Sequence, residues 1–153
     1  MSKDPRFLTG LRLIQSRRWF DAHEPLEDLW REAEEGAWRE FLQGLIQQVV
    51  ALEHLQRGNP RGCFKVWSRA RAKLKPLDDC VAGVGVGLWS EALVRFYTDE
   101  VNLADRVEAQ SKRGVAPREE PVELGALPPL ETWPLPTLSP DLEARLAEDL
   151  GSS

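Results

Sequence analysis

The segment from residue 38 to residue 55 is apolar around most of a helical circumference, and this feature constrains the fold most strongly. A helix with one narrow apolar stripe can lie on a surface, but a helix that is apolar on most sides must be covered by neighbours. Gly36 precedes the segment and Gly58-Asn59-Pro60 ends it. We therefore predict one long helix in the middle of a helical bundle. Its apolar positions are Trp38, Phe41, Leu42, Leu45, Ile46, Val49, Val50, Leu52 and Leu55.

Apolar residues at helical spacing predict further helices on both sides of this segment. The first covers residues 7–20, and the second covers residues 21–34. The second begins with a capping box, in which Asp21 is the N-cap residue and Glu24 stands three positions later. A fourth helix is predicted over residues 60–76, from one proline to another. Its expected inward residues are Phe64, Trp67, Ala70, Leu74 and Leu77, and its expected outward residues are Arg61, Lys65, Arg69 and Lys73.

The chain beyond residue 80 is less regular. Alternating glycines in residues 81–88 disfavour a strand, and no Gly-Lys-Ser/Thr follows them to complete a phosphate-binding loop. Helical spacing resumes over residues 89–107. From Gly114 onward, prolines force an extended arm that ends in a short helix at residues 141–150. We expect its apolar residues to dock in isolated pockets; they are Leu127, Leu130, Trp133, Leu135 and Leu138.

The composition is that of one folded domain. A chain of 153 residues with 42% apolar residues and six Trp can build a substantial core. We expect an all-α antiparallel bundle at residues 1–113 around a buried hairpin at residues 21–57. The Pro-rich arm and short helix at residues 114–153 would pack on this domain or extend from it. Truncation after Arg113 is expected to leave a folded protein, since the arm has few periodic apolar residues.

Charge and hydropathy exclude several classes of protein. A formal net charge of −5 disfavours a general nucleic-acid binder, which needs a positive surface to displace counterions. No apolar run approaches the roughly 18 residues that a membrane span requires, and no secretory signal opens the chain, so we expect a cytosolic protein. Cys63 and Cys80 are not in Cys-x-x-Cys spacing and are expected to be buried thiols rather than a disulfide.

Polar residues on an inward stripe of the second helix are the strongest sign of a site. His23, Leu26, Glu27 and Trp30 fall at i, i+3, i+4 and i+7, which places them on one face of a helix. A His and a Glu on a core-facing stripe are costly unless a polar partner meets them. The sequence therefore predicts partners on the facing helix.

The third helix offers such partners. If the chain reverses near Glu35-Gly36 as an antiparallel hairpin, Glu27 faces Gly44 and its neighbour Gln43, and His23 faces Gln47 and Gln48. Gly44 would let the two helices approach closely. His54 shares the polar arc with the glutamines and is expected at the far end of the cavity, opposite Ser16 and Arg17 of the first helix.

These residues also carry a family resemblance. FDAHEPLEDLW from Phe20, FLQGLIQ from Phe41, His54, and GNPRGC from Gly58 with the following Ala70 and Leu74 resemble domain of unknown function 309, over roughly residues 7–77. The resemblance implies an all-helical prokaryotic protein with these polar residues as its signature, and it implies no established activity. Cys63 stands where the family usually has Ala.

The residues leave three interpretations open. The cluster is an interhelical hydrogen-bond network that fixes register, or a site for a metal ion or small polar ligand, or part of a metal-dependent or acid–base enzyme. In the metal interpretation, His23 and Glu27 bind the ion. In the enzyme interpretation, Glu24 or His54 transfers the proton. Glu24 also suits the role of a helix-capping residue. We assign no catalytic residue and no cofactor. The ligand-binding candidates are His23, Glu24, Glu27, Trp30, Gln43, Gln47 and His54.

A noncatalytic interaction module is the alternative function. Such a module would bind another protein or a second copy of itself through the C-terminal arm or a face of the bundle. Arg61, Lys65, Arg69 and Lys73 recur every four residues and form a basic stripe, which we interpret as a solvated helix face rather than an RNA-binding surface.

Overall fold

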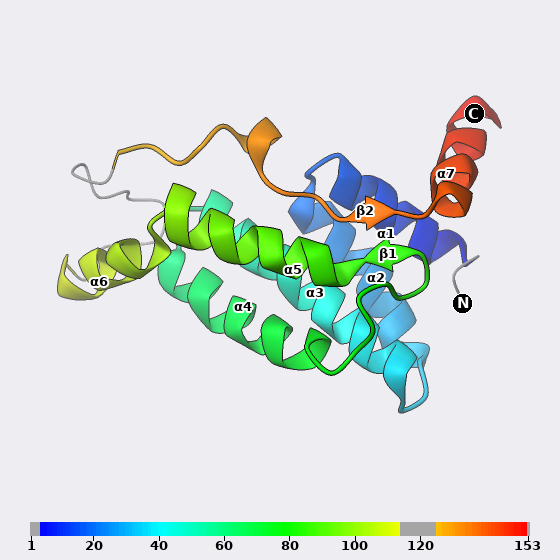
Figure 1. Cartoon of the computed structure of the whole chain (residues 1–153), viewed down its shortest axis with the longest axis horizontal. Helices are drawn as coiled ribbons and strands as arrows, with labels where there is room; N and C mark the ends of the chain where they lie inside the picture. Colours follow the sequence, from blue (N-terminus) through cyan, green and yellow to red (C-terminus); the bar gives the residue numbers. More distant parts are fainter. Residues whose placement is uncertain (1–3, 114–124, 153) are drawn as a thin grey trace.

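The computed structural model describes residues 4–113 and 125–152, and its fold is all-α, as the sequence predicts. The helix at the centre spans Ala37–Gln56 and buries residues on most of its sides. Figure 1 shows the order of the elements, with α6 at one end of the molecule and α7 beside the start of α1 at the other. The elements are α1 (Pro5–Gln15), α2 (Trp19–Glu32), α3 (Ala37–Gln56), α4 (Pro60–Leu74), β1 (Val84–Gly85), α5 (Val86–Arg95), η1 (Phe96–Glu100), α6 (Leu103–Arg113), η3 (Leu130–Thr132), β2 (Thr137–Leu138) and α7 (Pro140–Ser152).

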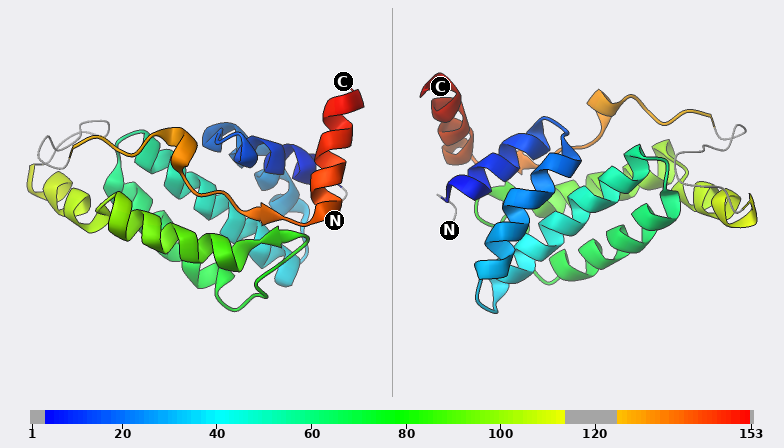
Figure 2. Two further views of the ribbon diagram at one scale, coloured as in Figure 1. Left: turned by 45° about the horizontal axis from the view of Figure 1, so that its top comes forward. Right: turned by 180° about the vertical axis from the view of Figure 1, so that it is seen from behind.

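α2 and α4 cover opposite flanks of α3, and Figure 2 shows the three helices side by side. Gly44 makes the α3–α4 contact close, because a Cβ at this position would lie 2.5 Å from Leu74 Cδ2. We expected Gly44 to bring α2 and α3 together, and that prediction is wrong: its bare face receives Leu74 of α4. The bounds predicted for α3 and α4 are confirmed to within a few residues, since a glycine or a proline marks each end.

The boundary between α1 and α2 differs from the prediction. α1 begins after Asp4, whose side chain accepts a hydrogen bond from Arg6 N, and it ends at Gln15 rather than at Phe20. Arg17 has φ 56°, so the chain turns there and Trp19 opens α2. Arg18 is the N-cap residue, without a side-chain cap, so the predicted capping box at Asp21 and Glu24 is absent.

The region after α4 is interrupted more often than its periodicity suggests. β1 is a two-residue strand that pairs antiparallel with β2, so the predicted absence of a strand in residues 81–88 is wrong for these two residues. The single helix predicted for residues 89–107 is instead α5, which continues into the π-helical turn η1, and α6. Asn102, with a φ of 55°, separates η1 from α6. The short C-terminal helix is confirmed as α7.

The arm is part of the main core rather than a set of isolated contacts. Trp133 is 2% exposed and belongs to the same apolar cluster as α3. Its ring lies 6.4 Å from Trp19 and 5.4 Å from Phe96, and its carbonyl accepts two hydrogen bonds from the Arg17 guanidinium. Trp89 Nε1 donates to Pro134 O at 2.9 Å. The expectation of isolated pockets is therefore wrong for Trp133, whose removal by truncation after Arg113 would strip the core.

Three further side chains lie on the opposite side from the one expected. Phe20 and Phe64 are 70% and 46% exposed, although helical spacing placed both inward. Cys80 is exposed, whereas Cys63 is buried as expected. Burial raises the pKa of the Cys63 thiol to about 12, so this thiol stays protonated and unreactive near neutral pH.

We predict that Trp133→Ala lowers the free energy of unfolding by about 3–5 kcal/mol, because it leaves a cavity against Trp19 and Phe96. Urea denaturation of the full chain measures this change. Glu131→Ala, two residues away and exposed, is the matched control and should have little effect. Equal stability of the two variants would show that the arm is not part of the core.

Candidate functional site

The outward face of α2 carries a chain of ion pairs. His23 Nε2 lies 2.7 Å from Glu27 Oε2, and Glu27 Oε1 accepts from Arg31 Nη2 at 2.8 Å. Arg31 also contacts Asp28 Oδ1 at 3.3 Å, and Arg18 pairs with Asp21 at 2.7 Å near the start of the helix. A surface hollow of about 310 Å³ lies over this face. We call its lining the α2 polar surface; it consists of Phe20, Asp21, His23, Glu24, Glu27, Asp28 and Arg31.

The buried stripe of α2 is displaced by about one residue from the stripe that the sequence predicted. His23 and Glu27 are partly exposed, and only Leu26 of the predicted stripe is fully buried. At about 100° per residue, the buried residues share a narrow arc and the His23–Glu27 pair lies on its flank. These two residues satisfy each other one turn apart, without a partner from another helix. The buried stripe of α2 is Trp19, Ala22, Leu26 and Leu29.

The glutamines of α3 do not join this surface. No hydrogen bond in the described part of the chain connects Gln43 or Gln47 to His23 or Glu27, and neither glutamine lines the hollow. Gln47 is partly buried, and its Oε1 has no hydrogen-bond partner among the described residues. The predicted polar cluster is therefore divided between two places, and its role as an interhelical register lock is wrong for these side chains.

Trp30 lies in the last turn of α2, next to the connection to α3, and does not line the hollow. The Arg39 guanidinium lies 4.3 Å from the centre of the Trp30 ring. The same guanidinium donates to Trp30 O and Ala33 O at 2.8 Å each, which satisfies carbonyls at the C-terminus of α2. Arg39 thus fixes the angle at which α2 enters the hairpin, a role that no pattern in the sequence indicated.

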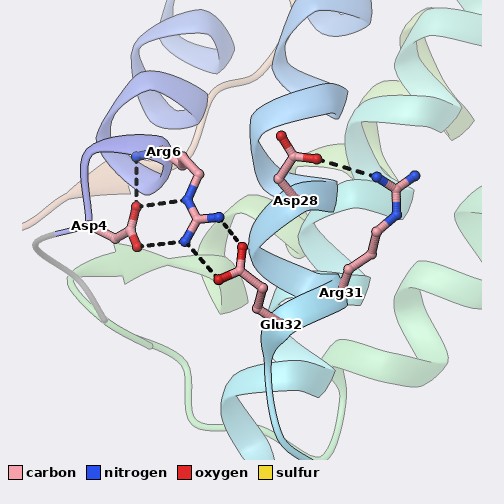
Figure 3. A network of polar contacts seen from close by, with 5 residues as sticks. All are labelled: Asp4, Arg6, Asp28, Arg31 and Glu32. Carbon is pink, nitrogen blue, oxygen red and sulfur yellow. Dashed lines mark hydrogen bonds and ion pairs between the residues drawn. The ribbon is translucent and has the colours of Figure 1, made fainter.

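A second set of charges links the start of α1 to the end of α2, and Figure 3 shows it beside the Asp28–Arg31 pair. The Arg6 guanidinium contacts the carboxylates of both Asp4 and Glu32. Hydrogen bonds from Arg6 lower the pKa of the Asp4 carboxyl and the pKa of the Glu32 carboxyl. Because Glu32 is exposed, we regard this network as a surface clamp of modest strength.

His54 lies in a different network from the one predicted. It does not face Ser16 and Arg17; its Nδ1 lies 3.2 Å from Asn59 Nδ2. Asn59 Oδ1 accepts from Gly62 N and from Gln110 Nε2, each at 3.2 Å. Gln110 Oε1 in turn accepts from Arg61 N at 2.9 Å.

The two backbone donors fix the orientation of every group in this network. Arg61 N and Gly62 N can only donate, so the oxygens of Gln110 and Asn59 must face them. Asn59 Nδ2 is then left as a donor toward His54 Nδ1, which requires that this ring nitrogen carries no proton. Burial lowers the pKa of His54 as well, since the charged ring would lose hydration. His54 is therefore a neutral structural acceptor that joins α3 to α4.

Residues 7–66 match the family model of a domain of unknown function, DUF309. The resemblance seen in the sequence is confirmed, over a shorter span than the residues 7–77 expected. No curated protein sequence matches the chain. The DUF309 segment reaches from α1 into α4 and contains every candidate residue: His23, Glu24, Glu27, Trp30, Gln43, Gln47 and His54.

The DUF309 segment offers little to a metal ion. Within the described part of the chain, no group of three or more His, Cys, Asp or Glu side chains is arranged to hold one. The metal prediction rested on His23 and Glu27, which form a pair and have Arg31 beside them. A cation would have to compete with this guanidinium for Glu27, so the pair is poorly suited to hold one.

We predict that stability falls as the pH drops below about 6.5, the ordinary pKa of His54, and that His54→Gln removes this part of the dependence. The pKa of His54 is lower in the folded than in the unfolded state. The unfolded chain therefore binds more protons in this range, and protonation favours unfolding.

Urea denaturation between about pH 7.5 and pH 5 measures this effect. The chain has two His, so His23→Gln, on the exposed face of α2, is the matched control and should keep the wild-type dependence. A His54→Gln variant whose stability varies with pH as in the wild type would contradict the account.

Proposed function

We propose that this protein is a noncatalytic interaction module that self-associates through two faces of its bundle. In this proposal the α2 polar surface of one copy contacts the exposed face of α4 on a second copy. The exposed face of α4, which we call the α4 basic surface, consists of Arg61, Phe64, Lys65, Ser68 and Arg69. The observation that carries the proposal is the complementarity of these two surfaces.

The α4 basic surface is positive and unneutralised. α4 contains no acidic residue, and the side chains of Arg61, Lys65 and Arg69 make no ion pair within the described part of the chain. Phe64 is 46% exposed in the middle of these cations. Its ring lies 6.4 Å from the Trp67 ring in an edge contact.

The α2 polar surface has the opposite charge and a similar layout. Phe20 is 70% exposed beside the carboxylates of Asp21, Glu24 and Asp28. The Glu24 carboxylate has no partner among the described residues. An exposed aromatic ring surrounded by charged groups resembles the anchor and polar rim of protein interfaces.

A second copy is the partner that both surfaces support together. α2 and α4 lie on either side of α3, so the two surfaces cannot meet within one molecule. The C-terminal arm is the other candidate for self-association. Its Trp133 is buried in the core of the same molecule, so the faces of the bundle are the better candidates for contact with a second copy. A contact between two different surfaces is heterologous and builds chains or rings of copies.

We infer a cytosolic location and no general binding of nucleic acid, as the charge and hydropathy of the sequence suggest. No described helix is both long and apolar enough to cross a bilayer. The proposal assigns no reaction and no cofactor.

We predict that the wild-type protein forms species larger than one chain at low ionic strength, and that salt reduces their fraction because it screens the two surfaces. Two charge-reversal variants separate this contact from nonspecific association. The first carries Glu24→Lys and Asp28→Lys, and the second carries Lys65→Glu and Arg69→Glu. Each alone should be monomeric, and an equimolar mixture should associate again, since each reversed face then meets a face of opposite charge.

Sedimentation velocity at several protein concentrations measures these species. Leu88→Ala, which shortens an exposed apolar residue on α5 outside both surfaces, is the control and should associate as the wild type does. A wild-type protein that is monomeric at every concentration and at low salt would rule out the self-association.

A small polar ligand at the α2 polar surface is the second candidate function. The hollow of about 310 Å³ and the unpaired Glu24 carboxylate favour it. A ligand-dependent rise in Tm that Glu27→Gln abolishes would support this candidate over self-association.

A further inference from the structure

The most deeply buried amide of the bundle is incompletely satisfied. Gln48 of α3 is 0% exposed, and its Oε1 has no hydrogen-bond partner among the described residues. Its Nε2 lies 3.5 Å from Ser90 Oγ of α5, at the limit of a hydrogen bond. An amide in an apolar core costs stability unless it is well bonded, and an apolar side chain would avoid that cost. In the part of the chain that the structure describes, Ser90 is the one side chain that the Gln48 amide reaches, so we infer that Gln48 acts through Ser90.

Ser90 lies in the wall of a hollow of about 300 Å³. The hollow is formed by the end of α4, the loop that follows it and the first turns of α5, which Figure 1 shows on the same side of the molecule. This volume is at the lower end of the range for small-molecule sites, so it suits a small metabolite rather than a nucleotide. Its apolar wall is formed by Leu74, Leu77, Val86 and Val94.

The charged side chains around this hollow have both signs and do not neutralise each other. Arg71 and Lys75 come from the end of α4, and Asp78 and Glu91 come from the loop and α5. None of these four forms an ion pair in the described part of the chain. The Arg71 guanidinium lies 5.0 Å from the centre of the Trp67 ring, which does not line the hollow, so Arg71 would turn from this ring to meet a bound anion.

Asp79 lies in the same wall but already has a structural role. Its backbone carbonyl accepts from Gly87 N at 2.9 Å, and its carboxylate lies against Gly87, where a Cβ would be 2.5 Å from Oδ1. A carboxylate at the first turn of α5 is favoured by the positive end of the helix dipole. The Asp79 carboxylate thus already occupies the N-terminus of α5. An anionic group in the hollow would pair with Arg71 and Lys75 instead.

We propose that this hollow binds a free α-amino acid with an aliphatic side chain. The carboxylate of the amino acid pairs with Arg71 and Lys75, and its ammonium group pairs with Glu91 and Asp78. The aliphatic side chain covers Leu74 and its apolar neighbours. Unpaired charges of both signs beside an apolar wall match a zwitterion with an apolar substituent.

Gln48 and Ser90 orient the carboxylate in this site. The Gln48 amide donates to Ser90 Oγ, so the hydroxyl proton of Ser90 is left to donate toward the ligand. Gln48 is then a positioning residue, which acts through Ser90. This site is separate from the two surfaces of the self-association proposal, and either proposal can fail alone.

Isothermal titration of the full chain with L-leucine tests the inference. We expect saturable binding at concentrations up to about 10 mM, and a rise in Tm. Leucinamide lacks the carboxylate and N-acetyl-leucine lacks the ammonium group, and each should bind at least about tenfold more weakly, a loss of about 1.4 kcal/mol. Ser90→Ala and Glu91→Gln should each weaken L-leucine binding, whereas Glu131→Gln on the arm should not.

Gln48→Met separates a ligand role from a structural one. Removal of a poorly bonded buried amide should leave the free protein at least as stable as the wild type, while L-leucine binding weakens. A stable Gln48→Met protein with unchanged affinity would overturn the positioning role. Absence of any heat or Tm shift with L-leucine, or equal binding of leucinamide and N-acetyl-leucine, would overturn the site itself.

Discussion

α3 carries apolar side chains on so many sides that neighbours must cover it along most of its length. α2 and α4 supply two of these neighbours, and each is joined to α3 by a short connection that favours antiparallel packing. Gly44 sets the distance to α4, because only a residue without Cβ leaves room for Leu74. Arg39 sets the direction of α2 through the carbonyls at its end.

The position of the polar residues follows from this coverage. With α3 enclosed, a polar side chain on it is costly unless a partner meets it, as Asn59 meets His54, whereas Gln47 and Gln48 each keep a buried oxygen without a partner among the described residues. α2 buries only one stripe of side chains against its neighbours, so His23 and Glu27 fall on the flank of that stripe and pair with each other. The polar groups therefore separate into an exposed surface on α2, a structural network around His54, and the buried Gln48 behind Ser90.

The elements that the sequence predicted well are those with local punctuation. Gly36 and Pro60 mark the beginning of α3 and of α4, because the conformational preferences of glycine and proline act within a turn. The break at Arg17 was missed, since an arginine in the left-handed region is imposed by packing and carries no local signal. A register error of one residue then placed His23 and Glu27 inside and Phe20 in the core.

Contacts between distant parts of the chain could not be predicted from one sequence. Pro60 indicated the start of α4, but nothing in the sequence connects Asn59 to Gln110. The prolines of the arm predicted an extended path, yet they do not tell which face of the bundle receives Trp133. Tertiary packing decides such contacts, because many pairings of similar apolar surface are available to the unfolded chain.

Native-state hydrogen exchange tests the central place of α3 most directly. The account predicts that backbone amides of α3 between Phe41 and Leu55 exchange only through global unfolding, with the free energy that urea denaturation gives. Amides of α6, which lies at one end of the molecule, should open at a lower free energy. Amides of α3 that open more easily than those of α1 or α6 would contradict the account.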